Sequence, residues 1–202
     1  MNDSNAKERE KAKLIDYDDL RKAAECHRQV RRYAQTIVRP DKKYIDVCRE
    51  IEESIRTVIS ANKIDAGISF PTGCSYNNIA AHYTPNPGDT KVIKKDEVIK
   101  IDIGTHVKGL LIDSAFTVCF DPVFDNLLLA SKEATMTGIK LSGIDARFSD
   151  IGTAIQEVMD SYELELNGKV YKIRPVRNLC GHQIGRYHVF IIRFMQERVY
   201  QL

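Results

Sequence analysis

Residues 99–118 read IKIDIGTHVKGLLIDSAFTV, and this stretch decides the fold. Ile, Leu and Val dominate it on both sides of a short segment that contains Gly109, which is typical of two strands joined as an antiparallel hairpin. We expect the strands over residues 98–104 and 110–120. A symmetric turn centred on residues 107–108 pairs His106 with Gly109, and the pairing continues outward residue by residue along both strands.

That register places Asp102 directly opposite Asp113 on one face of the hairpin, with Cβ atoms roughly 5 Å apart. Two carboxylates there repel each other and lose hydration among Ile and Leu. A proton, an Arg or Lys side chain, or a divalent cation would offset that cost. Oxygen ligands of this type suit Mn, Co, Fe, Zn or Mg. Geometry alone leaves a second interpretation open, in which one Asp turns to solvent and the other caps a turn.

The rest of the chain predicts two helices followed by strands, twice over. Helical spacing runs from residue 16 to 38 and again from 45 to 59, and a short strand follows at 67–70. The same order then repeats, with a helix over 124–141, a second helix capped by Ser149 or Asp150, and a hairpin at Asn167–Gly168. The sequence therefore predicts an α/β (α+β) fold of two related halves with helices on one side of a sheet, the second half being short.

Composition excludes several classes of protein. The chain has 202 residues, of which 43% are hydrophobic and 29% charged, so a packed core is expected rather than disorder. The formal net charge of +2 argues against a dedicated nucleic-acid binder. The five cysteines are widely spaced without a C-x-x-C, which favours reduced thiols in an intracellular protein. We expect neither a signal peptide nor a membrane span.

Two histidines stand in unusual local sequences. His182 lies between Gly181 and Gly185, which allow a close approach of the backbone to a crowded site. His82 follows two alanines that leave room around it. Taken singly, each is more often a core or surface histidine than a ligand, and for His82 a hydrogen-bonded buried histidine is the favoured interpretation. His27 and His106 are expected to be structural or solvated, on a helix and in a loop respectively.

Four segments carry a resemblance to a known family. Three of them are FPTGCSYNNIAAHYTPN at 70–86, the hairpin at 99–118 and NLCGHQIGRY at 178–187, the fourth is the shorter HRQVR at 27–31, and AIQEVMDSY at 154–162 fits as well. Together they resemble the type 2 methionine aminopeptidases, over most of the chain from about Tyr17 to Tyr187. The resemblance implies the pita-bread creatinase/aminopeptidase fold, in which two pseudo-symmetric halves surround two divalent metal ions.

The resemblance also implies roles for individual residues. Asp102, Asp113 and His182 match metal ligands, His82 matches a catalytic histidine that contacts the substrate, and Phe70 matches an aromatic residue of the methionine side-chain pocket. The implied reaction removes the initiator methionine from nascent chains, with Co, Mn, Fe or Zn as cofactor. The implied partners are N-terminal Met peptides and the ribosome in the cytoplasm, with no membrane and no direct DNA binding.

The chain departs from the family after residue 188. The family has five metal ligands, including two Glu beyond the histidine, whereas Glu197 is the only acidic residue after His182 here. We therefore expect a flexible lead-in at 1–13, a partial, C-terminally truncated catalytic domain at 14–188, and a divergent tail at 189–202. The alternative function is a non-catalytic binding protein of the same fold, associated with ribosomes or RNA.

Overall fold

The computed structural model describes residues 15–60, 65–176 and 182–191. The expected lead-in at 1–13 lies outside the described residues, as do Cys180, Glu197 and most of the expected tail. The expected boundary after residue 188 falls inside a strand, β8 (His188–Ile191). Within the described residues, no helix has the length and apolarity needed to cross a membrane.

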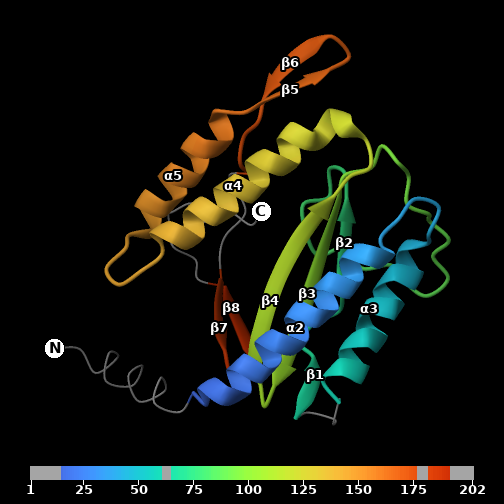
Figure 1. Ribbon diagram of the computed structural model, residues 1–202, viewed down its shortest axis with the longest axis vertical. Helices are drawn as coiled ribbons and strands as arrows, with labels where there is room; N and C mark the ends of the chain where they lie inside the picture. Colours follow the sequence, from blue (N-terminus) through green and yellow to red (C-terminus); the bar gives the residue numbers. More distant parts are fainter. Residues whose placement is uncertain (1–14, 61–64, 177–181, 192–202) are drawn as a thin grey trace.

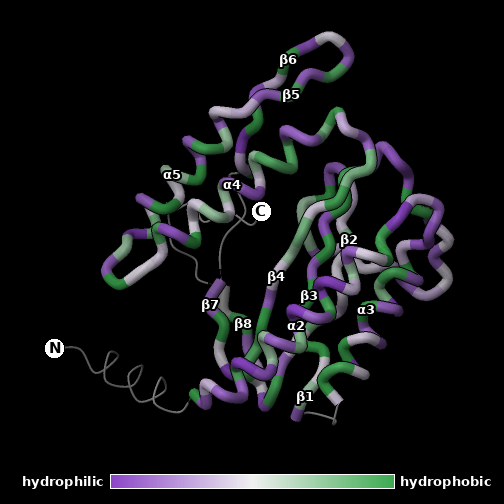
Figure 2. Tube along the Cα trace, viewed as in Figure 1, coloured by the Kyte–Doolittle hydropathy of each residue, from purple (hydrophilic) through white to green (hydrophobic). Residues whose placement is uncertain are grey.

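The first half of the molecule is a sheet covered on one face by two helices (Figure 1). Helix α2 (Tyr17–Ile37) begins at Asp16, whose carboxylate accepts hydrogen bonds from the backbone N–H groups of residues 18 and 19. Helix α3 (Tyr44–Val58) follows after a short connection. Hydrophobic and hydrophilic residues alternate along both helices (Figure 2), as expected for helices with one buried face.

Strand β3 (Ile99–Val107) is the centre of this sheet. It pairs antiparallel with β4 (Leu110–Val118) along one edge. Along its other edge it pairs with β1 (Ala66–Ile68) and β2 (Gly73–Tyr76). The sequence missed β2, because Pro and Gly around it suggested only an extended segment.

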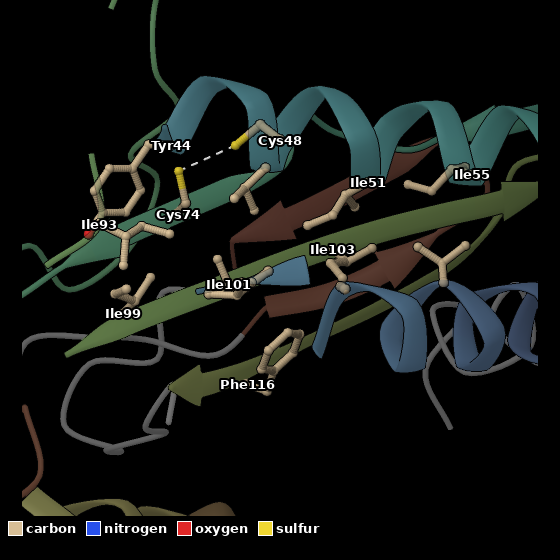
Figure 3. Close-up of a cluster of buried hydrophobic side chains, with 14 residues drawn as sticks. Tyr44, Cys48, Ile51, Ile55, Cys74, Ile93, Ile99, Ile101, Ile103 and Phe116 are labelled. Carbon is tan, nitrogen blue, oxygen red and sulfur yellow. Dashed lines mark hydrogen bonds between the residues drawn. The ribbon is translucent and has the colours of Figure 1, made fainter. Parts of the chain in front are cut away.

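One face of β3 builds the core between the sheet and the two helices (Figure 3). Ile99, Ile101 and Ile103 have no exposed surface, and they pack with α3 residues such as Ile51 and Ile55. Side chains alternate between the two faces of a strand. The residues between these isoleucines, Asp102 among them, therefore point to the opposite face.

The second half contributes helices and hairpins. Helices α4 (Asp125–Leu141) and α5 (Phe148–Asp160) follow the single turn η1 (Pro122–Phe124) and bury a small cluster of their own. Strands β5 (Glu163–Leu166) and β6 (Lys169–Lys172) form the hairpin expected at Asn167–Gly168, where both turn residues have positive φ, as a type I′ turn requires.

A second hairpin was not expected from the sequence. It consists of β7 (His182–Gly185) and β8, which pair with each other and lie beside β4 (Figure 1). Its strands are only four residues long, which is close to the shortest pattern that alternation can reveal.

Candidate metal centre

The register of the β3–β4 hairpin differs from the expected one by a shift in the turn. Val107 pairs with Leu110, so the turn is Lys108–Gly109, and both residues have positive φ (46° and 76°). The turn expected at residues 107–108 was wrong because it requires β-branched Val107 in the left-handed region, where Gly is favoured.

The shift moves Asp113 opposite Gly104 and Asp102 opposite Ala115. The two carboxylates are therefore not directly opposed, which corrects the expectation. They still share one face of the hairpin, because Asp102 is two residues from Gly104 on the same strand. Diagonal neighbours of this kind remain within reach of each other.

The two carboxylates influence each other strongly. Burial, the charge of Asp113 and a hydrogen bond with Asp113 together raise the pKa of Asp102 to about 6. Burial also raises the pKa of Asp113, against the lowering effect of His182. Oδ1 of Asp102 is buried without a hydrogen-bond partner. A shared proton or a bound cation would therefore stabilise the Asp102 and Asp113 carboxylates.

His182 reaches this pair from strand β7. Its Nε2 lies 3.4 Å from Oδ2 of Asp113, and its Nδ1 is buried without a hydrogen-bond partner. Among the described residues, His182 is the sole ion-pair partner of the two aspartates. Lys100 shares their face of β3, but its ammonium group donates to the backbone oxygen of Asn77 at 2.7 Å.

The three expected ligands are brought together in pairs rather than around one point. Asp113 contacts Asp102 on one side and His182 on the other. In the described ranges, no group of three His, Cys, Asp or Glu side chains is arranged to hold a metal ion. The donor chemistry nevertheless fits a divalent ion, since carboxylate oxygens and an imidazole with unpartnered buried atoms are at hand.

The two remaining expected site residues lie on the same face. His82 is exposed, has a left-handed backbone (φ 66°), and is close enough to lower the pKa of both aspartates. The ring of Phe70 lies against Gly104, in the space that a Cβ atom there would occupy. Since Gly104 is opposite Asp113, the ring of Phe70 stands beside the carboxylate pair.

Two side chains of α2, His27 and Arg31, contact β4 next to Asp113, and the sequence did not predict this role. Nε2 of His27 lies 2.7 Å from the hydroxyl of Ser114, and Arg31 donates to the backbone oxygen of Ala115 at 2.8 Å. These contacts tie α2 to the segment that follows Asp113. The expected loop position of His106 was wrong, because this residue is buried within β3.

We expect His27 to make folding stability depend on pH. Burial and the charge of Arg31 lower its pKa to about 4 in the folded state, against an ordinary value near 6.5. Between these values the unfolded chain binds more protons, so stability decreases as the pH falls from about 6.5 to 4, by roughly 3 kcal/mol at most.

Chemical denaturation of the parent and of His27→Gln across pH 4–7 measures this contribution. The glutamine amide can still hydrogen-bond to Ser114 but does not titrate, so the difference between the two curves isolates His27. Parallel curves for parent and variant would contradict the prediction.

The chain matches a known protein family and several of its members. A model described as metallopeptidase family M24 matches residues 18–196. The chain is 57% identical over 173 residues to methionine aminopeptidase 2A of Arabidopsis thaliana, and 58% identical over 171 residues to methionine aminopeptidase 2 of Dictyostelium discoideum. These alignments cover 86% and 85% of this chain but 39% of each relative, so the chain spans about two fifths of the relatives' length.

Solved structures share the fold. The structure of methionine aminopeptidase from Thermotoga maritima superposes with a TM-score of 0.69 at 21% sequence identity. The superposition covers 94% of this chain and 74% of that chain. The helices and strands described above are therefore arranged as in the pita-bread fold that the sequence predicted.

Proposed function

The chain belongs to metallopeptidase family M24, and from this premise we propose that its residues form part of the active site of a metal-dependent aminopeptidase. The substrate is the N-terminal methionine of nascent chains, and the site of action is the cytoplasm, near the ribosome. One observation carries the proposal: Asp102 and Asp113 lie on one face of a hairpin, both desolvated, with the imidazole of His182 against Asp113.

Asp102, Asp113 and His182 would hold the ions, which are Co, Mn, Fe or Zn by the resemblance. When bound, such ions polarise a peptide carbonyl and activate water at neutral pH. The burial and mutual repulsion of the two carboxylates favour cation binding, because a cation stabilises both charges at once. Two further Glu ligands, expected from the family, would complete the set.

The other residues of the face would handle the substrate. His82 is exposed beside the carboxylates, so its imidazole is in position to donate to the peptide oxygen as charge develops there. The ring of Phe70 forms an apolar wall over Gly104, which suits the methionine side chain. Both residues approach from the segment between β1 and β3, on the side of the sheet away from α2 and α3.

Release of Met from a Met-Ala-Ser peptide in the presence of Mn or Co tests the proposal. We expect the 202-residue chain to release little or no Met, because losing carboxylates that touch the ion weakens metal binding more than the roughly 10- to 100-fold typical of losing the groups behind the ligands. We expect activity when residue 187 is continued into the second half of a methionine aminopeptidase 2 relative.

His82→Ala in the continued protein should remove most of the activity while leaving metal binding near that of the parent. Rapid Met release by the 202-residue chain, sensitive to Asp113→Ala, would mean that the ligand set is closed by other residues of this chain. A continued protein that folds and binds Met peptides without cleaving them would instead favour the non-catalytic binding protein.

A further inference from the structure

We infer that the ring of Tyr187 is a positioning group that docks the β7–β8 hairpin on the β3–β4 turn and thereby holds the imidazole of His182 against Asp113. The role of His182 as a ligand rests on the proposed function. The positioning itself rests on contacts within the chain and is tested without any metal.

Among the residues that the structure describes, the β7–β8 hairpin has no hydrogen-bonded ladder to the rest of the sheet. In the described part of the chain, β7 and β8 form a separate two-stranded sheet, although β7 lies beside β4 (Figure 1). A two-stranded hairpin is marginally stable by itself. Its place beside β4 therefore depends on contacts other than strand pairing.

One such contact is at the tip of the hairpin. The backbone N–H of Tyr187 donates to the oxygen of Gly109 at 2.9 Å, and the Tyr187 ring meets the His106 ring edge-on with centroids 5.8 Å apart. The Tyr187 ring also fills the space that a Cβ atom at residue 109 would occupy. Gly109 thus serves two needs, the positive φ of the turn and the close approach of this ring.

The turn that receives the ring is firmly attached to the first half of the molecule. The ammonium group of Lys108 lies 2.7 Å from Oδ2 of the buried Asp19 in α2, and the backbone N–H of Lys108 donates to the oxygen of Asp65. The tip of the hairpin also brings Arg186 near Lys108. The two like charges do not favour docking of the tip, so the attachment there is provided by the Tyr187 contacts.

The second contact is the His182–Asp113 pair at the other end of β7. Gly109 and Asp113 are four residues apart, or about 13 Å along an extended strand. Two attachments so far apart fix the direction of β7 as well as its position. If the Tyr187 contact at the tip is lost, β7 keeps the pair at His182 without its second fixed point, and we expect the imidazole to move away from the carboxylate more readily.

Carbethoxylation of histidines by diethyl pyrocarbonate, followed by tryptic mass spectrometry, measures this position in the metal-free chain. Cleavage after Arg186 places His182 and His188 in separate peptides. His188 reports the reactivity of an exposed histidine on the same hairpin, and His27, which is 4% exposed, reports any general loosening of the fold. The variants are Tyr187→Ala and Tyr187→Phe, with Tyr171→Ala as the matched control, since both tyrosines are 49% exposed.

We expect His182 to react more slowly than His188 in the parent, and its rate to rise about tenfold in Tyr187→Ala, as loss of an aromatic contact predicts. Tyr187→Phe keeps the ring and should match the parent, as should Tyr171→Ala. The rate of His27 should not change in any variant.

An unchanged His182 rate in Tyr187→Ala overturns the inference. An equal rise in the reaction rate of His27 also overturns it, because it would show that the ring stabilises the whole fold. A Tyr187→Phe variant with the same His182 rate as Tyr187→Ala overturns it as well. Repeating the measurement with added Co²⁺ separates the two proposals. Absence of protection at His182 in the parent counts against its role as a ligand, whereas the positioning is judged by the metal-free rates alone.

Discussion

The Asp102→Asn variant should lose divalent-ion binding and yet be more stable than the parent when metal-free. In the parent both carboxylates are desolvated, and the charge of Asp113 contributes to the raised pKa of Asp102. An amide at residue 102 removes one charge and can donate an N–H to Asp113, so we expect a gain of about 1 kcal/mol, or roughly 2–4 °C in melting temperature. The same change removes one of the charged ligands that we propose for the ion.

Two measurements on each protein check this prediction. Calorimetric titration with Co²⁺ should show an affinity at least about 100-fold lower than in the parent, since losing a side chain that touches the ion costs more than losing one that only supports a ligand. Thermal unfolding in the presence of a chelator should show the gain in stability. Asp96→Asn is the matched control, because it removes the same charge at an exposed turn position and should change neither quantity.

A variant that loses both stability and Co²⁺ binding would show that the aspartates serve the fold through contacts other than a cation. A variant that retains Co²⁺ affinity would show that Asp102 is not a ligand.

The Gly104→Ala variant should lose about 100-fold in kcat/KM for a Met peptide, measured in the protein continued into a relative's second half. A Cβ atom at residue 104 overlaps the Phe70 ring and the Ser69 hydroxyl, so the ring has to move off its place beside Asp113. Displacements of about 1 Å near a reacting centre commonly cost two orders of magnitude. Gly104 does not lie in the left-handed region, so the loss is steric and does not come from backbone strain.

The effect of Gly104→Ala should depend on Phe70. Residues in direct contact show non-additive effects, so adding Gly104→Ala to Phe70→Ala should cost little more than Phe70→Ala alone. Gly143→Ala is the matched control, since nothing lies within 4 Å of its added Cβ atom, and it should leave kcat/KM unchanged. Equal losses in the Phe70→Ala background and in the parent would contradict a role for Gly104 through Phe70.

Much of the fold could be predicted from local patterns. Helix α2 was expected over 16–38 and spans Tyr17–Ile37, because apolar spacing and the Asp16 cap are properties of the segment itself. The Asn167–Gly168 hairpin was equally local. The β3–β4 hairpin is predicted correctly from its apolar strands, but its register depends on the turn, and Lys108–Gly109 adopt the positive φ values that Val107 disfavours. Strand β2 and the β7–β8 hairpin were missed, since strands of four residues carry little periodic signal.

The sequence by itself determined that Asp102 and Asp113 share one face of a hairpin, because alternation along paired strands fixes the face whenever the register shifts by an even number of residues. Only the tertiary structure decided which groups meet them there. The Phe70 ring packs against Gly104, the residue opposite Asp113, because Gly104 has no side chain, and His182 reaches Asp113 from a hairpin whose tip docks on Gly109. Such contacts join residues that are far apart in the chain, and they depend on the shape and packing of several elements at once, which no local pattern encodes.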